Sequence, residues 1–464
     1  MNDKVNQGDT AAALDSLYVA QQKIYPREVP GRFRNLRTLA TLGLLGIFYG
    51  LAWLRWDGHQ AVLFDLPARK FYIFGLTLLP QDFFFLTWLL ILAALSLFFF
   101  TALAGRLWCG YACPQTVWTD AFVWMERITE GSRQQRIKLD KAPWSFNKLW
   151  RKSAKQVLWL SFALFTGFTF VGYFTPIRSL LAEIQSFATG PWETFWVLFY
   201  GFATYGNAGY LREQVCKYMC PYARFQSAMF DKHTLIITYD AARGEPRGSR
   251  ARGMEYKAEG LGDCIDCTLC VQACPTGIDI RKGLQYECIA CAACIDACDG
   301  VMDKMNYPRG LLRYSTQASM EGNAPHVLRP RTVIYAVVLL LLSGGFLYAI
   351  THRNLVELDV LRDRNVMYRE TDDGLIENVY TLRVVNKDSR PHSYTVSISG
   401  VPDAQLHMDR LVVVAGASEV VSLTVRVDAP ALPTGGPHPI DFIVTGTDQQ
   451  SLQTTAASRF FSPM

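Results

Sequence analysis

The sequence has little charge for its length, and its cysteines occupy only part of the chain. Of its 464 residues, 19% are charged, against about 25% in a typical soluble domain, and 50% are hydrophobic. No cysteine precedes Cys109 or follows Cys298, and the seven histidines show no paired spacing. We find no G-x-G-x-x-G motif, P-loop or Ser/His/Asp signature. These absences argue against an ordinary soluble enzyme and against a disulfide-stapled secreted domain.

The charge balance and hydropathy narrow the class further. The net charge of +5 is small and dispersed, so the sequence predicts no nucleic-acid partner. Disorder is excluded as the main state, because disordered chains are poor in apolar residues. A mean hydropathy of +0.09 is too high for an ordinary soluble enzyme and too low for a protein that lies wholly in the membrane. We therefore expect membrane spans joined to soluble domains.

Five uncharged stretches are long enough, or nearly so, to cross a bilayer, which takes roughly 17–25 residues. They are 38–54, 83–105, 156–177, 194–211 and 332–352. The second and fifth are the most apolar. Thr, Asn and Gly in the fourth suggest that it faces protein more than lipid. We expect no cleavable signal peptide, because 37 polar or mixed residues precede the first apolar run.

Lysine and arginine counts in the short loops predict the orientation of these spans. The segments 1–37 and 106–155 hold six and ten of these residues, whereas 55–82 and 178–193 hold three and one. The N-terminus is therefore predicted to lie inside the cell. The basic loop 127–155 is interpreted as topogenic and lipid-facing.

The expected fold class is a polytopic α-helical membrane protein with two soluble domains. We predict a cytoplasmic N-terminal segment (1–37), a four-span membrane domain (38–211), a cytoplasmic ferredoxin-type domain (212–331), a fifth span (332–352) and a periplasmic domain (353–464). In this topology, all twelve cysteines lie on or near the reducing cytoplasmic side. That placement favours thiolates held for metal or redox chemistry.

Eight of the cysteines form two runs with the same spacing, and the first run reads C-x2-C-x2-C-x3-C-P. A cubane cluster has irons at its corners, and three thiolates from a tight loop can bind three of them. In two-cluster ferredoxins the fourth ligand comes from the other run. We therefore predict two [4Fe–4S] clusters with crossed ligands. Their ligands are Cys264, Cys267, Cys270 and Cys298 for one, and Cys274, Cys288, Cys291 and Cys294 for the other.

Zinc is the alternative for these thiols. A structural zinc ion takes four ligands, usually as two pairs, and does not require eight thiols in two identical quartets. The second run departs from the ferredoxin pattern in one place, because Asp299 stands where Pro275 ends the first run. Since the thiolate is the ligand and the proline is not, Cys298 remains a predicted ligand.

A second pattern occurs just past two of the predicted spans. The segments Cys109–Pro114 and Cys216–Pro221 both read C-x-Y-x-C-P and suggest the internal duplication of a two-span hairpin. In a helical turn, positions i and i+4 lie on one face, so each segment would offer two thiols together. Each proline disfavours α conformation at the cysteine before it, and should end or kink the helix there.

These two thiol pairs admit three interpretations. Four thiols near one plane suit a soft ion such as Cu(I). They could also cycle between dithiol and disulfide. Alternatively, buried cysteines serve as small hydrophobic residues. We favour a functional role, so the predicted catalytic residues and copper ligands are Cys109, Cys113, Cys216 and Cys220.

The last part of the chain, from residue 355 onward, changes character. Short alternating stretches are separated by turn-forming residues, and we predict strands at 380–385, 394–399, 411–414, 420–427 and 440–444. Several short strands in a domain of this size predict a C-terminal immunoglobulin-like β-sandwich. Its role is left open between docking to a partner and a structural cap.

Taken together, these features closely resemble the CcoG/FixG/RdxA family over nearly the whole chain. The resemblance rests on the C-x3-C-P hairpins, the run CIDCTLCVQACPTGIDIRKGLQYECIACAACIDAC, the following MDKMNYPRGLLRY, the last span and the β-rich tail. It implies a multi-pass iron–sulfur protein of the bacterial inner membrane that reduces Cu(II) to Cu(I) for assembly of cbb-type cytochrome c oxidase. The hairpins also resemble the membrane subunits of NapH/NosR-type quinol dehydrogenases.

The function expected from the residues and the resemblance is a cupric reductase. Electrons would enter the clusters and pass to the membrane thiols, where copper is the substrate. The implied partners are membrane lipid, copper-delivery and oxidase-assembly proteins, and a cytoplasmic or quinol electron donor. Two rival functions stay open: a quinol-linked respiratory electron conduit to which copper is irrelevant, and a non-catalytic redox sensor.

Overall fold

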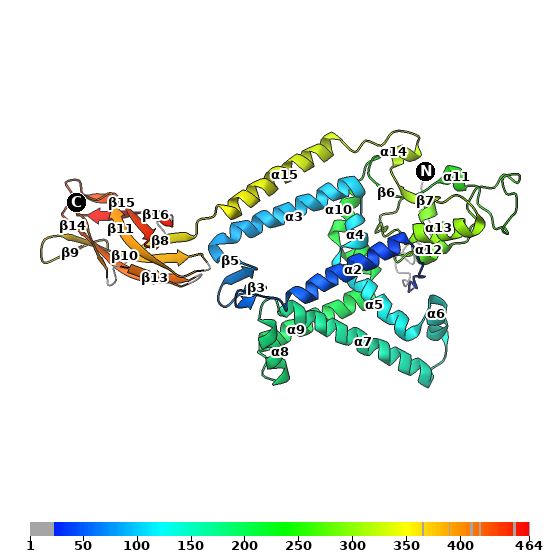
Figure 1. Cartoon of the computed structure of the whole chain (residues 1–464), viewed down its shortest axis with the longest axis horizontal. Coiled ribbons are helices and arrows are strands. Elements are labelled where there is room, and N and C mark those ends of the chain that lie inside the picture. Colours follow the sequence, from blue (N-terminus) through cyan, green and yellow to red (C-terminus); the bar gives the residue numbers. More distant parts are fainter. Residues whose placement is uncertain are drawn as a thin grey trace, which may run out of the picture. The chain divides into compact units, whose positions relative to one another are not determined.

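The computed structural model describes residues 23–363, 366–388, 390–408, 412–416, 419–448 and 452–463. The chain divides into two compact units (Figure 1). The first, which we call the cysteine unit, consists of residues up to Ile47, Ser96–Gly167 and Leu198–Tyr335 and holds all twelve cysteines. The second, the sandwich unit, consists of Phe48–Leu95, Phe168–Val197 and Ala336–Met464.

Helices dominate the chain outside its C-terminal part. The longer ones are α2 (Arg32–Leu51), α3 (Phe83–Ala104), α5 (Pro114–Glu130), α6 (Arg133–Lys141), α7 (Phe146–Val171), α8 (Ile177–Gln185), α9 (Pro191–Thr204), α10 (Pro221–Met229), α13 (Ala293–Met305) and α15 (Pro330–Thr351). The short ones are α4 (Leu107–Tyr111), α11 (Ala241–Gly244), α12 (Leu269–Ala273) and α14 (Gln317–Met320). Two π-helical segments, Tyr205–Leu211 and Val215–Met219, follow α9.

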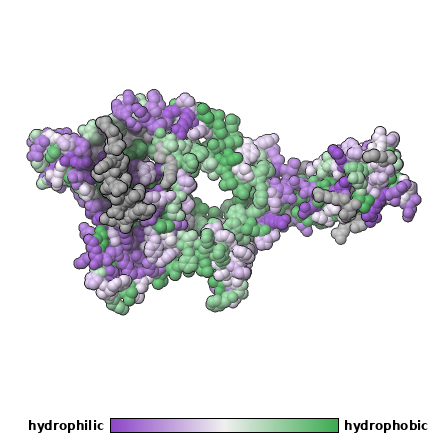
Figure 2. All heavy atoms as spheres, turned by 180° about the vertical axis from the view of Figure 1, so that it is seen from behind, coloured by the Kyte–Doolittle hydropathy of each residue, from purple (hydrophilic) through white to green (hydrophobic). Residues whose placement is uncertain are grey.

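Three helical segments among the described residues are long and apolar enough to cross a membrane: Pro80–Ala104, Phe146–Val171 and Pro330–Thr351. They contain all or most of three predicted spans. The third predicted span, 156–177, differs at its end, because α7 stops at Val171 and α8 starts again at Ile177. Pro176 between them disfavours helix at the residue before it. Figure 2 shows hydrophobic side chains at the surface of the long helices.

The other two predicted spans remain predictions. Helix α2 covers most of 38–54, but its first turns carry Arg32, Arg34 and Arg37. Helix α9 has 14 residues, and the rest of 194–211 is π-helical. The π-helical part holds Asn207 and two of the three glycines of this stretch, Gly206 and Gly209. Neither segment meets the length and composition of the three helices above.

The two cysteine runs fold alike. Strands β6 (Ile236–Tyr239) and β7 (Leu312–Ser315) pair antiparallel beside them. In the first run Asp266 and Thr268 have φ of 52° and 56°, and in the second Ala290 and Ala292 have φ of 53° and 59°. Positive φ is uncommon for residues other than glycine. The repeated left-handed residues flank Cys267 and Cys291 and curl each run into the tight loop that the cysteine spacing predicts.

The C-terminal domain consists of two antiparallel sheets. One has the strand order β12-β14-β10-β8, with β9 beside β10, and the other has the order β13-β11-β15-β16. Tyr380 of the first sheet and Phe442 of the second lie fully buried, with ring centroids 4.9 Å apart. The strands are β8 (Val356–Arg362), β9 (Arg369–Glu370), β10 (Ile376–Asn386), β11 (His392–Ser399), β12 (Gln405–Met408), β13 (Val412–Ala415), β14 (Val420–Ala429), β15 (Gly436–Gly446) and β16 (Gln453–Ser462).

These strands confirm the five predicted ones, apart from Leu411, which lies outside the described residues. The sequence analysis missed β8, β9, β12 and β16. Strand β16 reads QTTAASRFFS and has few large apolar residues to mark an alternating pattern. Its backbone pairs with β15 from Gly436↔Ser462 to Thr445↔Gln453, and its Phe460 is fully buried in the core of the domain. A short sheet of β3 (Val62–Asp65), β4 (Lys70–Ile73) and β5 (Leu76–Leu78) and the pair β1 (Arg55–Trp56) and β2 (His59–Gln60) precede α3.

Candidate functional site

The first predicted cluster site is a cavity lined by thiols from both runs. Cys264, Cys267, Cys270 and Cys298 all line it, together with Tyr239 and Arg281 and with Met302 and other apolar side chains. Burial raises the pKa of Cys298 to about 12, and the thiols of Cys270, Cys264 and Cys267 raise that pKa further. The last cysteine of the second run therefore lies with the first three of the first run. This is the grouping that crossed ligation requires.

The second predicted site brings Cys274 to the second run. Burial is the main reason why the pKa of Cys288 is raised to about 12, and Cys291 and Cys274 add to the shift. The thiol of Cys274 also raises the pKa of Cys291 and the pKa of Cys294, in addition to the larger effect of burial. The hydroxyl of Thr276 lies 3.2 Å from the sulfur of Cys274 and can hydrogen-bond to it.

These eight thiols fit two cubane clusters. Burial raises the pKa and disfavours a free thiolate at five of them, so iron would have to displace the thiol proton to bind at Cys270, Cys288, Cys291, Cys294 and Cys298. Within the described ranges, no three His, Cys, Asp or Glu side chains form a group tight enough for a single metal ion. In a cubane, each of the four thiolates binds a different iron atom. The assignment of individual ligands stays a prediction.

Acidic residues of the second run tie it to the rest of the cysteine unit. Asp299, which stands in place of the expected proline, accepts a hydrogen bond of 3.1 Å from the backbone N–H of Gly310. Asp296 accepts bonds from the N–H groups of Phe33 and Arg34, at 3.2 and 2.8 Å, in the first turn of α2. The second run therefore anchors the start of α2.

The first C-x3-C-P motif joins α4 to α5. Cys113 is extended, with φ −62° and ψ 129°, and Pro114 is the first residue of α5. Gly110 packs so closely on the second run that a Cβ there would lie 2.7 Å from the carbonyl oxygen of Ile289. The motif therefore lies against the loop between Cys288 and Cys291.

The second motif lies on a π-helix instead of an α-helix. Cys216 lies within the π-helical segment Val215–Met219, and Cys220 is extended, with φ −79° and ψ 108°. Pro221 begins α10. As predicted, the helix does not continue through the cysteine before either proline: α4 ends at Tyr111, two residues before Cys113, and the π-helical segment ends at Met219, next to Cys220. The π-helical turn was not expected, and such turns are frequent at functional sites.

The two motifs bring their four cysteines near one another, although no three of these thiols in the described structure lie close enough to hold one metal ion. Burial raises the pKa of Cys109 to about 12, the thiols of Cys113, Cys216 and Cys220 add to this shift, and Arg106 opposes it. The thiol of Cys109 donates to the side-chain oxygen of Gln226 at 3.3 Å. Burial likewise raises the pKa of Cys216 to about 11, with Cys113 and Cys220 adding and Arg106 opposing.

Arg106 is the buried cation of this group. It is 3% exposed, and its Nη2 donates to the backbone oxygen of Ala223 in α10. Besides Cys109 and Cys216, it also lowers the pKa of Cys288 in the second cysteine run. Sequence reasoning missed this residue, because a single arginine after an apolar stretch looks like an ordinary span boundary. Only its burial among thiols of both sets distinguishes it.

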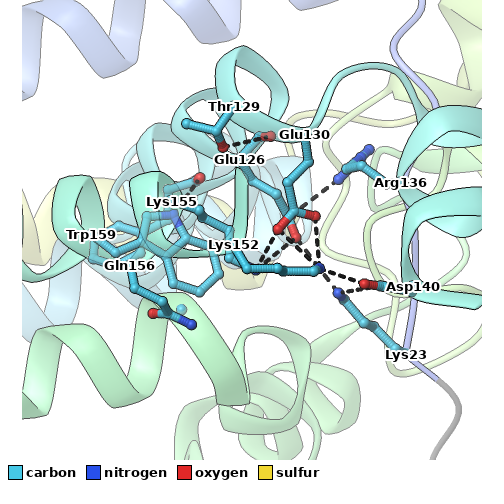
Figure 3. A network of polar contacts seen from close by, with 12 residues as sticks. Lys23, Glu126, Thr129, Glu130, Arg136, Asp140, Lys152, Lys155, Gln156 and Trp159 are labelled. Carbon is cyan, nitrogen blue, oxygen red and sulfur yellow. Dashed lines mark hydrogen bonds and ion pairs between the residues drawn. The ribbon is translucent and has the colours of Figure 1, made fainter. Parts of the chain in front are cut away.

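Several basic side chains of the loop after α5 belong to a buried ion network that the sequence analysis did not anticipate, whereas Lys138 and Lys141 of the same loop are exposed. Glu126 of α5 is fully buried and accepts hydrogen bonds from Arg136 at 3.1 Å and Arg212 at 3.0 Å. Figure 3 shows Lys152 and Lys155 of α7 reaching the same two helical turns of α5, where Glu130 pairs with Lys155 at 2.8 Å. The carboxylates of Glu126 and Glu130, one helical turn apart on α5, pair with these basic side chains in the interior of the protein.

This network reaches the second motif through Arg212. Arg212 has a φ of 42°, and its Nε donates to the backbone oxygen of Gly209 at 2.8 Å. Burial alone would raise the pKa of Glu126, but Arg212, Lys23 and Arg136 hold it below its ordinary value. The conformation of the chain just before Cys216 therefore depends on a buried ion pair with α5.

Comparison with known proteins agrees with the cysteine pattern. Residues 211–317 match a family model described as a "4Fe-4S dicluster domain", and residues 84–130 match a "4Fe-4S binding domain". Residues 346–463 match a model described as an "IG-like fold at C-terminal of FixG", whose description also suggests an oxidoreductase. The immunoglobulin-like character of the C-terminal sandwich and the iron–sulfur character of the cysteine runs are thereby shown.

Three curated relatives are similar over most of their length. "Nitrogen fixation protein FixG" of Rhizobium meliloti is 39% identical over 437 residues, covering 86% of this chain and 83% of the relative. "Protein RdxB" of Cereibacter sphaeroides is 40% identical, with 89% and 90% covered. "Protein RdxA" of the same organism is also 40% identical, with 83% and 84% covered. The chain therefore belongs to the FixG/RdxA family and is an iron–sulfur electron-transfer protein.

Proposed function

We propose that this protein reduces Cu(II) to Cu(I) at the thiols of Cys109, Cys113, Cys216 and Cys220, and that the product serves the assembly of a cbb-type cytochrome c oxidase. The observation that carries the proposal is the packing of the first C-x3-C-P motif both on the second cysteine run, at Gly110, and on the helix that follows the second motif, where Cys109 donates to Gln226. The proposed partners are copper-delivery and oxidase-assembly proteins.

The proposal includes the membrane topology predicted from the sequence. Five spans place the N-terminus and the domain 212–331 in the cytoplasm, and the sandwich 353–464 in the periplasm of a bacterial inner membrane. Three apolar helices of sufficient length support this topology. The basic residues of 127–155 still lie on one side of it, although many of them pair with acids.

The thiols would bind copper as thiolates. Soft sulfur ligands favour Cu(I) over Cu(II), so binding at this group favours the reduced product. Arg106 supplies a buried positive charge that lowers the pKa of Cys109 and Cys216 against the effect of burial. Thr116 donates to the backbone oxygen of Cys109 at 2.5 Å and fixes the turn that carries this cysteine.

The close packing at Gly110 supports transfer of electrons to this group. Iron–sulfur clusters, when bound, exchange one electron at a time, as reduction of one cupric ion requires. The first motif lies directly against the backbone of Ile289 and Ala290, with no side chain of its own at Gly110 to hold the two apart. The thiol group therefore lies next to the loop that carries Cys288 and Cys291.

The test is a single turnover with the full chain, purified anaerobically. The protein is reduced, freed of reductant and given Cu(II), and Cu(I) is measured with a chromophoric chelator while the cluster absorbance is followed. A variant with all four motif cysteines changed to serine should keep its iron and lose Cu(I) formation. Lys217→Ser is the matched control, since Lys217 lies inside the second motif at a position that the first motif fills with Gly110.

Undiminished Cu(I) formation by the four-serine variant would reject the copper role. The same experiment separates the two rival functions. A quinol-linked conduit predicts cluster reduction by quinols and indifference to copper in the wild-type protein. A redox sensor predicts no turnover with any acceptor and a conformational change on oxidation.

A further inference from the structure

The cysteine unit contains a cavity of about 570 Å³ next to the second motif. Its volume lies within the range of roughly 300–1,000 Å³ typical of small-molecule sites. Side chains from α2 and α5 form its walls, and Cys216 lines it. The proposed copper chemistry does not use this space.

Most of the lining is apolar, but one part is polar. Leu42 and Leu45 of α2 and Trp124 of α5 belong to the apolar lining. Arg37 and Asp120 belong to the polar part, where Nη2 of Arg37 lies 3.0 and 2.9 Å from the two carboxylate oxygens. The Nε of Arg37 is buried and has no hydrogen-bond partner among the described residues. The cavity therefore suits a molecule with an apolar body and a polar, hydrogen-bonding end.

The cavity also lies between two groups of redox-active residues. Thr276 and Ile289 line it, and they lie within two residues of Cys274 and next to Cys288. Ala293, which precedes Cys294, lines it as well. Cys216 of the thiol group lies on another part of the wall. A molecule in this cavity would lie beside both the second cluster site and the copper thiols.

An anionic lipid headgroup is the main alternative occupant, because several arginines line the cavity. Most of these arginines already have acidic partners. Arg34 and Arg127 both pair with Glu28, and Arg212 pairs with Glu126 at 3.0 Å. Arg37 pairs with Asp120 at 2.9 Å. Paired guanidinium groups leave little positive charge for a phosphate, which favours a neutral occupant.

We infer that this cavity binds a quinol, with Arg37 and Asp120 at its ring oxygens and Leu42, Leu45 and Trp124 along its apolar body. A quinol hydroxyl would donate to the Asp120 carboxylate, beside the Arg37 guanidinium that pairs with it. This inference rests on the proposed function, which supplies Cu(II) as the acceptor of the quinol's electrons. One quinol loses two electrons and two protons to become quinone: the electrons reduce two Cu(II) ions to two Cu(I), and the protons pass to solvent by way of the Asp120 carboxylate.

The test uses the full chain in lipid nanodiscs and a photoreactive azido-quinone. After illumination, mass spectrometry should find the label on peptides of α2 and α5. Ala121→Trp and Thr41→Trp, whose side chains would fill the cavity, should lower the labelling about tenfold or more. Ile128→Trp is the matched control, because Ile128 lies on α5 outside the cavity and is 61% exposed. Iron content reports whether each variant has folded.

Competition in the wild-type protein keeps the inference testable even if a variant fails to fold. A short-chain quinol should abolish the label, and cardiolipin should leave it unchanged. Labelling elsewhere, equal labelling in the cavity-filled variants, or competition by cardiolipin alone would overturn the inference. Single-turnover copper reduction by chemically reduced wild-type protein needs no quinol, so its failure would reject the proposed function and leave the labelling result standing.

Discussion

The two copies of the C-x-Y-x-C-P motif have nearly the same sequence pattern and different surroundings. The first lies on an α-helix and packs, through Gly110, on the loop between Cys288 and Cys291. The second lies on a π-helix, has Lys217 in the place of that glycine, and is joined through Arg212 to a buried ion network. The first copy therefore lies beside the predicted cluster site, whereas Cys216 of the second copy lines the cavity.

This difference shows that two copies of one sequence pattern can pack against different neighbours. Both motifs end at an extended cysteine before a proline, so the shared residues determine the local backbone. Residues outside the shared pattern determine which neighbour each copy meets. We expect the first copy to control electron entry and the second to control copper and ligand access.

The largest expected effect comes from removing the thiol site next to the first copy. Cys291→Ser and Cys267→Ser should each lower the iron content from about eight to about four atoms per chain, because each removes one ligand of one [4Fe–4S] cluster. Cys291→Ser should abolish single-turnover Cu(I) formation, whereas Cys267→Ser should retain part of it. Iron analysis and the chelator assay check both. An equal loss of Cu(I) formation in the two variants would mean that the cluster site next to the first copy is no more important for copper reduction than the other site.

The second prediction concerns the ion network that holds the second copy. Glu126→Gln leaves Arg212 and Arg136 buried without their carboxylate, which should cost about 3–5 kcal/mol of unfolding free energy. Denaturant unfolding in detergent measures this loss. Alkylation should increase at Cys216 more than at Cys109, since only the second copy depends on Arg212.

The matched control is an exposed pair in the same unit. Asp303→Asn removes the carboxylate that Arg309 contacts at 2.6 Å, with 46% and 67% of the two side chains exposed. Because water screens such pairs, this variant should unfold like the wild-type protein. A loss as large as that of Glu126→Gln would contradict the assignment of stability to the buried network.

The third prediction tests the close contact of the first copy. In Gly110→Ala, the new Cβ would lie 2.7 Å from the oxygen of Ile289 and 2.9 Å from that of Ala290, so the backbone must move apart. A misplacement of this kind should slow Cu(I) formation about tenfold to a hundredfold. Lys217→Ala at the matching position of the second copy should leave the rate unchanged. Rapid-mixing measurements on pre-reduced protein give both rates, with iron content as the check on folding.

The smallest expected effect is a change in thiol reactivity. Arg106 lowers the pKa of Cys109 and Cys216, so Arg106→Gln should raise both pKa values. Each unit of increase lowers the thiolate fraction about tenfold at a fixed pH below the pKa, and the thiolate is the form that is alkylated. Iodoacetamide labelling of the copper-free protein between neutral and alkaline pH measures the shift. Unchanged labelling at both cysteines would show that Arg106 does not influence the pKa of Cys109 or Cys216.

Sequence reasoning predicted what depends on local patterns. The cysteine spacing indicated two cluster loops, Pro114 and Pro221 marked the helix ends, and alternation marked five strands of the sandwich. It did not anticipate the buried ion network at the basic loop 127–155, because the acidic partner Glu126 lies on the preceding helix and a count of lysines and arginines cannot show which of them are paired. It also missed Gly110, whose role appears only when Ile289, far away in the sequence, lies against it.

The sequence by itself determined the family, the iron–sulfur chemistry and the extended backbone of Cys113 and Cys220 before their prolines. These features follow from spacing along the chain, which fixes local backbone geometry. Only the tertiary structure decided that the first motif packs on the helix after the second, that Arg106 is buried there, and that a cavity opens beside Cys216. These features join segments that are more than a hundred residues apart in some cases. Contacts of that kind depend on how helices pack, and no local pattern encodes them.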